Sequence, residues 1–351
     1  MNTTASSTAA GTGSLQLEYL SSRELCGHPA SWWQGVLGVV GFERLPAIDR
    51  ARVPVTASMI RPLQETTDLC EVWRIADPEV QLTSGAGQAG LQYRHSDDLL
   101  FGCLTLAESA IDARSESGAL LRATEIAYQE IFDLLNETGH RHLIRIWNYL
   151  PRINEQADGD ERYRHFNAAR QTVFRNCGRA VQGTVPAASA LGSPPGSPLS
   201  IYFLAAPRPP KTIENPRQTS AYHYPLKFGK HSPIFSRACL WGESGDSKLF
   251  ISGTASIVGH ESLHPGDVIA QTRETLVNIG ALIHEANRAV GASRYSLDGL
   301  MLKVYLRTPS DLPAIEAAMA ELPSPASILY LQADICREDL LVEIEAVGNP
   351  N

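Results

Sequence analysis

The feature that most constrains the fold is an order of strand-like and helix-like segments that occurs twice along the chain. In the second half, strand and helix patterns alternate over residues 248–256, 268–290, 300–307 and 312–321. In the first half, the same order recurs more weakly over residues 98–106, 123–137, 143–149 and 161–174. The repetition predicts an α+β protein that contains two related units.

The length and composition allow each unit a core of its own, since the chain has 351 residues, of which 43% are hydrophobic. Residues 185–199 are rich in proline, glycine, serine and alanine and are predicted to be a surface linker. This linker separates an amino-terminal domain at residues 15–184 from a carboxy-terminal domain at residues 200–351. Residues 1–14 lack the basic start and apolar core of a signal peptide and are predicted to be a disordered tail.

The overall charge and the cysteines exclude several classes of function. Lys+Arg 30 against Asp+Glu 38 gives a net charge of −8, so the chain has no basic field that would attract nucleic acid. No apolar stretch is long enough to span a membrane. The six cysteines are scattered without a C-x-x-C pair, which is typical of reduced thiols in a cytoplasmic protein. An anionic small molecule can still bind where basic side chains gather in a pocket.

The last strand-like segment, residues 340–346, carries two carboxylates in an otherwise apolar run. Because strand side chains alternate, Glu343 and Glu345 share one face. Burial of a carboxyl group raises its pKa, which allows it to act as a general acid. The preceding segment, residues 328–336, alternates in the same way, and a hairpin between the two segments is predicted to bring Cys336 close to the glutamates. The same pattern also fits a solvated polar face of an antiparallel sheet.

Two familiar motifs match as strings but fail on their context. Residues 85–90 fit G-x-G-x-x-G, yet the residues after them do not form the helix pattern that would cradle a phosphate. Residues 260–264 fit H-E-x-x-H, but Pro265 and Gly266 follow at once, so a loop is predicted in place of a zinc-binding helix. The sequence therefore predicts neither a metal site nor a nucleotide site.

Aromatic and basic side chains offer donors suited to carboxylates and hydroxyl groups. They are Arg145, Trp147 and Tyr149 on one strand face, Tyr163, Phe166 and Arg170 on one helix face, Tyr222 and Tyr224 in a loop, and Lys303, Tyr305 and Arg307 on another strand face. Taken singly, each basic residue also fits an exposed surface position. Each aromatic residue also fits a position in the core.

The last hundred residues resemble the YjgF-type reactive-intermediate deaminase family. The segments that carry this resemblance are residues 250–253, 267–278, 303–306 and 341–346. That family places a carboxylate-binding arginine after Pro-Ala in the penultimate strand, where this chain has Ser327. The resemblance implies the family's fold, whereas the departure at Ser327 speaks against enamine or imine hydrolysis.

The whole chain is similar to the chorismatases, which join a YjgF-like carboxy-terminal catalytic domain to a divergent amino-terminal domain. The motifs that carry this similarity are residues 145–149, 163–166 with Arg170, 214–216, 221–225, 235–237 and 340–345. The similarity implies two YjgF-like α/β units, the first of them divergent.

The same similarity implies specific roles. In chorismatases, the first glutamate of the final V-E-I-E motif, here Glu343, protonates the enolpyruvyl methylene carbon. A glycine in the F-I-S-[GA] strand together with a cysteine before the final hairpin marks the hydroxybenzoate-forming type, and this chain has Gly253 and Cys336. The implied reaction converts chorismate to pyruvate and 3-hydroxybenzoate, with or without 4-hydroxybenzoate, through an arene oxide.

The implied site contains no metal and needs no cofactor. Its catalytic residues are Glu343 and Cys336, and its substrate-binding residues are Tyr149, Arg170, Tyr222, Tyr224, Arg237, Gly253 and Lys303. Two alternatives stay open at this point. One is a chorismate hydrolase that forms a dihydroxycyclohexadiene carboxylate and pyruvate, and the other is a non-catalytic YjgF-type metabolite-binding protein.

Overall fold

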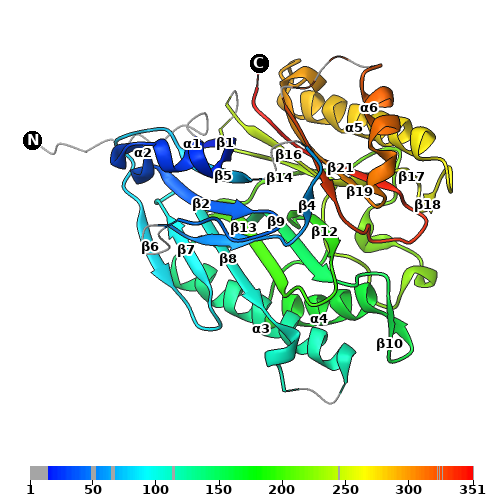
Figure 1. Cartoon of the computed structure of the whole chain (residues 1–351), viewed down its shortest axis with the longest axis horizontal. Coiled ribbons are helices and arrows are strands. Elements are labelled where there is room, and N and C mark those ends of the chain that lie inside the picture. Colours follow the sequence, from blue (N-terminus) through cyan, green and yellow to red (C-terminus); the bar gives the residue numbers. More distant parts are fainter. Residues whose placement is uncertain are drawn as a thin grey trace, which may run out of the picture.

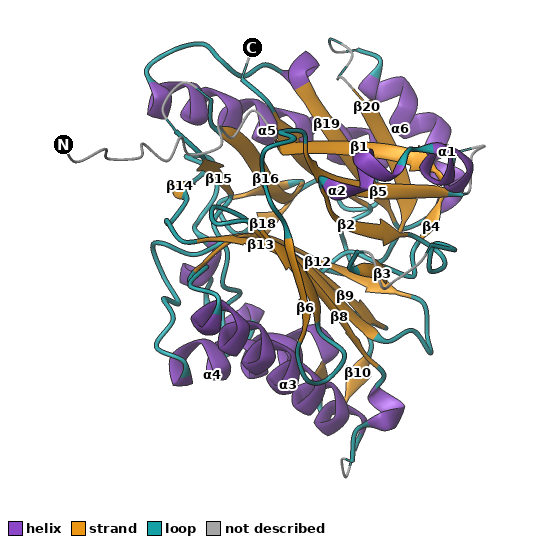
Figure 2. Ribbon diagram, turned by 90° about the vertical axis from the view of Figure 1, so that its left-hand side faces the viewer, coloured by secondary structure: helices purple, strands orange, loops and turns teal. Residues whose placement is uncertain are grey.

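The computed structural model describes residues 15–48, 53–64, 68–112, 115–243, 246–321, 323, 325 and 327–350. The tail predicted at residues 1–14 lies outside these residues. Three main sheets surround a shared core, and helices lie on their outer faces (Figure 1 and Figure 2). This arrangement confirms the predicted α+β class. None of the helices in the described part of the chain has the length and apolarity that crossing a membrane requires.

The carboxy-terminal unit is a seven-stranded sheet covered on one face by two helices. In spatial order its strands are β14 (Lys211–Ile213), β15 (Ala238–Trp241), β16 (Lys248–Ala255), β21 (Val342–Gly348), β19 (Leu300–Leu306), β20 (Ser327–Gln332) and β4 (Arg61–Pro62). The helices are α5 (Val268–Val290) and α6 (Leu312–Met319). Short elements complete the unit at η3 (Ala221–His223), η4 (Leu226–Phe228), β17 (Ile257–Val258), β18 (Glu261–Ser262), η5 (Leu297–Gly299) and η6 (Pro309–Asp311).

Helix α5 begins and ends where its sequence signals predict. The Asp267 side chain accepts a hydrogen bond from the Ala270 amide at 2.9 Å, which satisfies a free donor of the first turn. Gly291 ends the helix in the left-handed conformation, with φ of 73°. Between these caps, Ile279 and its helical neighbours pack in one cluster with Ile344 of β21, so the apolar face of β21 is turned toward α5.

The middle unit is a six-stranded sheet with its own pair of helices. In spatial order its strands are β12 (Ala187–Ser193), β9 (His142–Pro151), β13 (Leu199–Ala206), β8 (Leu100–Leu106), β7 (Gln92–His95) and β6 (Thr83–Ala86). The helices are α3 (Glu116–Glu137) and α4 (Arg162–Asn176), and the short elements are η2 (Glu108–Ala110), β10 (Gln156–Ala157) and β11 (Asp160–Glu161). In Figure 1, α3 and α4 lie at the end of the molecule opposite to α5 and α6.

The two large units share one topology. In each unit the last strand is antiparallel to both of its neighbours: β13 lies between β8 and β9, and β21 lies between β16 and β19. The next pair outward is parallel, β9 with β12 and β19 with β20. This order corrects the predicted hairpin at the end of the chain, because β19 lies between β20 and β21. An alternating pattern shows which side chains share a face but does not show which strand is the neighbour.

A third and shorter copy of this topology precedes the other two. Its sheet has the order β1 (Leu15–Ser21), β5 (Leu69–Ile75), β2 (Val36–Gly41) and β3 (Val55–Ala57), with α1 (Ser22–Gly27) and α2 (Ala30–Gln34) between β1 and β2. Here too the last strand, β5, is antiparallel to both neighbours, and β2 is parallel to β3. The predicted amino-terminal domain therefore contains two units, which we call the amino-terminal unit and the middle unit.

The prediction of a surface linker at residues 185–199 is wrong. Residues 187–193 form β12, which is almost wholly buried and pairs with β9. The small residues that suggested a linker instead allow close packing, since a Cβ on Gly192 would lie 2.5 Å from Asp334 Cβ. Strand β13, predicted in the second domain, belongs to the middle sheet. Apart from the short edge strand β4, the carboxy-terminal unit therefore begins after residue 206.

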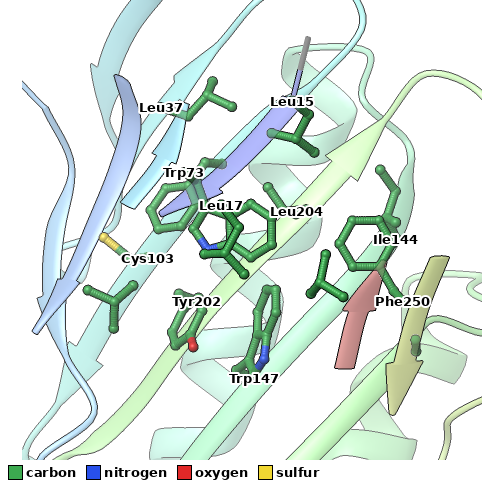
Figure 3. Packing of buried hydrophobic residues seen from close by; sticks show 14 of the residues in the cluster. Leu15, Leu17, Leu37, Trp73, Cys103, Ile144, Trp147, Tyr202, Leu204 and Phe250 are labelled. Atoms are coloured by element: carbon green, nitrogen blue, oxygen red, sulfur yellow. The ribbon is translucent and has the colours of Figure 1, made fainter. Parts of the chain in front are cut away.

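The centre of the molecule is an aromatic core shared by the three units. Trp147 stacks on Tyr202 with ring centroids 4.5 Å apart, and Trp73 contacts Trp147 at 5.6 Å, as Figure 3 shows. These rings come from β9, β13 and β5, and Phe250 of β16 in the carboxy-terminal unit lies 6.2 Å from Trp73. Each unit therefore contributes its inner sheet face to one core, which fixes the clefts between units in place.

The two motifs that failed on context form hairpins. Residues 85–90 run from the end of β6 into the turn before β7, and β6 and β7 are antiparallel. Residues 260–264 begin in the turn between β17 and β18 and include β18. Neither segment is helical, as predicted.

Candidate active site

A cavity lies between the middle unit and the carboxy-terminal unit, where α4 and β12 of the former face β16 and β21 of the latter. It has an inner part of about 370 Å³ and an outer part of about 630 Å³. Both parts are lined by Tyr163, Phe235, Gly253, Cys336 and Glu343. The inner part adds Asn148, Phe166, Asn167, Arg170 and residues 188–190, and the outer part adds Glu161, Arg164, Tyr224, Phe228, Pro233, Arg237, Ala255, Ile257 and Arg337.

Glu343 of β21 lies where the two parts of the cavity meet. The residue is 4% exposed, and its carboxyl group makes no hydrogen bond to any residue that the structure describes. Burial and, next, the charge of Glu345 raise the pKa of Glu343 to about 8, against the opposing charges of Arg145 and Arg237. The group is therefore mostly protonated at neutral pH, which is the state that a general acid requires.

Gly253 of β16 provides the room for this carboxyl group. A Cβ at this position would lie 1.9 Å from Glu343 Oε1 and 3.1 Å from Ser189 Oγ. The first distance is far below a van der Waals contact. Any larger residue at position 253 must therefore move the Glu343 carboxyl group.

Glu345, on the same face of β21, lies in a buried network outside the cavity lining. Its Oε2 accepts hydrogen bonds from Arg145 Nη2 at 2.7 Å and from Ser189 Oγ at 2.6 Å, and its Oε1 lies 2.8 Å from Lys303 Nζ. Burial alone would raise the pKa of Glu345, but the charges of Lys303 and Arg145 and the hydrogen bonds from Lys303 and Ser189 lower it to about 2. The two glutamates thus share a face, as predicted, but differ in protonation.

Two residues that were predicted to bind the substrate, Lys303 and Tyr149, lie in this buried region and do not line the cavity. Lys303 Nζ donates to Glu71 Oε2 at 2.7 Å and to the Tyr202 hydroxyl at 2.9 Å. The Tyr149 hydroxyl lies 3.1 Å from the Tyr305 hydroxyl in the same buried region. We call Glu71, Arg145, Lys303 and Glu345, with the groups that hydrogen-bond to them, the central network.

Cys336 lines both parts of the cavity from the loop between β20 and β21. Arg307 holds this loop, since its guanidinium group donates to the carbonyl oxygens of Ile335 at 3.2 Å, Arg337 at 3.0 Å and Leu340 at 3.1 Å. Burial and, next, the charge of Glu343 raise the pKa of the Cys336 thiol to about 12. The residue therefore reaches Glu343 as predicted, though through a loop rather than a hairpin, and it is a neutral thiol.

Arg170 of α4 lines the inner part of the cavity and is packed against aromatic rings. Its guanidinium group stacks over Tyr128 and Phe174, at 5.3 and 5.1 Å from the ring centroids. The residue is 3% exposed, and its Nε and Nη2 atoms have no hydrogen-bond partner among the described residues. A buried guanidinium with unused donors is suited to bind a carboxylate.

Three arginines line the outer part, Arg164, Arg237 and Arg337. Arg237 Nη2 donates to the Tyr224 hydroxyl at 2.8 Å and to the Thr219 carbonyl at 2.7 Å. Arg337 lies over the Phe228 ring, with its Cζ 4.1 Å from the centroid. Glu343 therefore lies between one arginine of the inner part and three of the outer part.

The structure places most of the predicted site residues together. Arg170, Tyr224, Arg237, Gly253, Cys336 and Glu343 line the cavity, and Tyr149, Tyr222 and Lys303 do not. Tyr222 packs edge-on against His223 and against the middle unit's core. The sequence prediction missed Arg337, because a charged residue in a short polar connection resembles an ordinary loop residue. It also missed Glu71 and Ser189, whose segments gave no signal of proximity to Glu345.

Comparison with known proteins assigns this arrangement to a family. Residues 71–205 match the family described as Chorismatase FkbO/Hyg5-like, N-terminal. The chain is 36% identical over 327 residues to a 3-hydroxybenzoate synthase of Streptomyces hygroscopicus, covering 90% of this chain and 92% of that protein. It is also 36% identical over 292 residues to a chorismatase of Streptomyces rapamycinicus, covering 81% and 83% of the two chains.

The chain belongs to the chorismatase family. A crystal structure of a chorismatase matches this one with a TM-score of 0.81 and 31% identity, over 95% of this chain and 98% of that one. The family match continues through residues 185–199 and ends at residue 205, within β13. In this chorismatase, the segment predicted to be a linker is thus part of the amino-terminal family domain.

Proposed function

We propose that this chorismatase converts chorismate to pyruvate and 3-hydroxybenzoate, with Glu343 as the general acid. The observation that carries the proposal is the Glu343 carboxyl group, which makes no hydrogen bond to the residues that the structure describes, has a pKa of about 8 and lies between cationic groups at both parts of one cavity. Its relatives include a protein named 3-hydroxybenzoate synthase.

The substrate's charges fit the cavity. Chorismate has two carboxylates, one on the ring and one on the enolpyruvyl group. Arg170 supplies unused donors in the inner part, and Arg237 and Arg337 supply positive charge in the outer part. Each charge-assisted hydrogen bond contributes about 1.5–3 kcal/mol to binding.

The first chemical step is a proton transfer from the Glu343 carboxyl group to the enolpyruvyl methylene carbon. The methylene becomes a methyl group, an oxocarbenium ion forms, and Glu343 becomes a carboxylate. Arg145 and Arg237 are the positive charges that favour this carboxylate. The Glu345 anion opposes the Glu343 carboxylate, so it keeps Glu343 protonated until the substrate is aligned.

The second step separates the products. The C4 oxygen attacks C3 while the C4 hydroxyl proton passes to the Glu343 carboxylate, which restores the acid. The bond between C3 and the ether oxygen breaks, and pyruvate leaves with that oxygen. The resulting arene oxide opens and loses a ring proton to give 3-hydroxybenzoate. Pyruvic acid and hydroxybenzoic acid together are isomeric with chorismic acid, so no water is consumed.

Cys336 and Gly253 are proposed to direct this outcome. With a pKa of about 12, Cys336 is a neutral thiol and a poor base, so we assign it to steering the ring rather than to removing the C4 hydroxyl proton. Gly253 sets the place of the Glu343 carboxyl group by the absence of a Cβ.

Product analysis tests the proposal. Purified protein incubated with chorismate in ¹⁸O-labelled water should give pyruvate and unlabelled 3-hydroxybenzoate, because the phenolic oxygen comes from the substrate's own C4 hydroxyl. Labelled hydroxybenzoate contradicts the arene-oxide route. A dihydrodiol, which has the mass of hydroxybenzoate plus one water, identifies the hydrolase alternative whether the label is found in it or in pyruvate, and intact chorismate identifies a binding protein.

A further inference from the structure

We propose that Glu71, in the amino-terminal unit, is a positioning residue of the reaction: through Lys303 it fixes the charge and place of Glu345, and thereby keeps the proton on Glu343. This inference rests on the proposed role of Glu343 as general acid. It assigns a catalytic purpose to a unit that contributes no lining residue to the cavity in the described part of the chain.

The geometry is a continuous chain of buried charged groups. Glu71 of β5 is 0% exposed and accepts a hydrogen bond from Lys303 Nζ at 2.7 Å. The same Nζ lies 2.8 Å from Glu345 Oε1. Glu345 is two residues from Glu343 on the same face of β21. These contacts connect the amino-terminal unit to Glu345, the carboxylate beside the proposed acid.

Glu71 is held as firmly as the other members of the chain. Trp73 Nε1 donates to its Oε1 at 2.6 Å, and the Tyr202 hydroxyl donates to its Oε2 at 3.3 Å. These donors come from the amino-terminal unit and the middle unit, and Lys303 comes from the carboxy-terminal unit. The Glu71 carboxylate is thus a point where all three units meet.

The formal charges of the central network cancel. Arg145 and Lys303 supply two positive charges, and Glu71 and Glu345 supply two negative charges, in ion pairs of 2.7 and 2.8 Å. Without Glu71 the network would have an excess positive charge. An excess positive charge near Glu343 favours its ionised form and removes the proton that the reaction needs.

Other charged groups also face Glu343, and the removal of Glu71 leaves them in place. Arg145 of β9 and Arg237, which precedes β15, favour the carboxylate, and Glu345 of β21 opposes it. The titratable groups Cys336, from the loop before β21, and Tyr163, from α4, also lie near Glu343. The Glu71 charge is the part of this balance that can be altered without touching the cavity.

The test compares Glu71→Gln with the double variant Glu71→Gln/Lys303→Met. The first substitution leaves an excess positive charge, and the second restores a neutral network through the remaining Arg145–Glu345 pair. Glu18→Gln is the matched control, because it removes a carboxylate that pairs with Arg74 at 3.1 Å on the same small sheet. The readout is kcat for pyruvate release as a function of pH, with thermal unfolding measured in parallel.

A general acid is active below its pKa, so kcat should be constant at low pH and fall as pH rises through the pKa of Glu343. Two unit charges about 10 Å apart in a medium of effective dielectric constant about 20 shift a pKa by about one unit. We therefore expect Glu71→Gln to lower the midpoint of this fall by about one pH unit, with little change in the low-pH plateau. The double variant should return the midpoint toward that of the unaltered enzyme, and Glu18→Gln should not move it.

Several results would overturn the inference. Loss of rate by the same factor at every pH in Glu71→Gln means a merely structural role, and an unmoved midpoint means that Glu71 does not influence Glu343. If Glu71→Gln does not fold, the inference still predicts a folded double variant with a near-normal midpoint, and a shifted midpoint there contradicts it. Failure of the proposed function is separate, since it appears as a Glu343→Gln variant that retains normal kcat.

Discussion

Strands β13 and β21 hold the same place in two units of one topology, but only β21 carries carboxylates on its inner face. Ser200 of β13 pairs with Thr105 and Tyr149, and Glu343 of β21 pairs with Ala255 and Tyr305. Two residues further along, β13 has Tyr202 where β21 has Glu345. The last strand therefore has the same position in both units, and the residues at these two positions determine whether it carries an acid.

The clefts beside these strands differ in the same way. The cleft between the amino-terminal and middle units contains a cavity of about 490 Å³, lined by residues such as Thr56, Cys103 and Thr105 and by no charged residue in the described part of the chain. The cleft beside β21 contains Glu343 and arginines at both ends. Repetition of the fold produces more than one cleft, but charge is concentrated in one of them.

Removal of the acid from β21 should have the largest effect on activity. Glu343→Gln keeps the side-chain volume but cannot deliver a proton, so kcat should fall on the order of a hundredfold or more, the usual scale for a positioned general acid. Pyruvate release from chorismate measures it. Glu345→Gln should be milder at low pH, and the reverse order would exchange the roles of the two glutamates.

Removal of the inner cation should weaken binding rather than chemistry. In Arg170→Gln, one substrate carboxylate loses charge-assisted hydrogen bonds of about 1.5–3 kcal/mol, so KM should rise about tenfold or more with kcat less affected. Tyr224→Phe is the comparison at the outer end, where the loss should be smaller because Arg237 remains. Unchanged steady-state kinetics in Arg170→Gln would place it outside the substrate site.

A methyl group at position 253 should shift the acid without removing it. Gly253→Ala forces the Glu343 carboxyl group away from a Cβ that would otherwise lie 1.9 Å from its oxygen. We expect kcat to fall by about tenfold, a smaller loss than that from removing the acid. In the double variant Gly253→Ala/Cys336→Ala, dihydrodiol should increase at the expense of 3-hydroxybenzoate. An unaltered product mixture, identified by mass, contradicts the steering role.

The stability of the protein should also report the protonation of Glu343. Its pKa is raised from 4.5 to about 8 on folding, so its contribution to stability is present below pH 4.5 and is lost as pH rises through about 8. The Glu343→Gln variant has no titrating group at this position, so its stability does not fall in this way as pH rises. The difference in free energy of unfolding between the variant and the unaltered protein should therefore change by about 1.4 kcal/mol per pH unit between these limits. A difference that does not depend on pH would contradict the raised pKa.

The sequence predicted features that depend on local pattern. The caps at Asp267 and Gly291 define α5, and alternation places Glu343 and Glu345 on one buried face. Features that depend on distant neighbours were not predictable in this way. The pairing of β21 with β19, the burial of β12 and the existence of the amino-terminal unit follow from contacts between segments that are far apart in the chain.

The same distinction explains the outcome at Lys303. The pattern correctly placed its side chain on the inner face of β19, yet a lysine on an inner face can meet either a ligand or a buried carboxylate. Which of the two occurs depends on Glu71, which is 232 residues away in sequence. Arg337 is the opposite case, a residue that was not predicted at the site but lines the cavity, because the fold of residues 333–341 brings it there.

Glu343 and Glu345, two carboxyl groups on one strand, have opposite protonation at neutral pH in this mechanism. Titration of glutamate side-chain carboxyl carbons by ¹³C NMR measures this directly, with Glu343→Gln and Glu345→Gln variants assigning the two resonances. We predict that the Glu343 resonance titrates with a pKa near 8, and that the Glu345 resonance stays that of a carboxylate down to the lowest pH at which the protein is folded. A Glu343 resonance that is already that of a carboxylate at pH 6 would contradict the account.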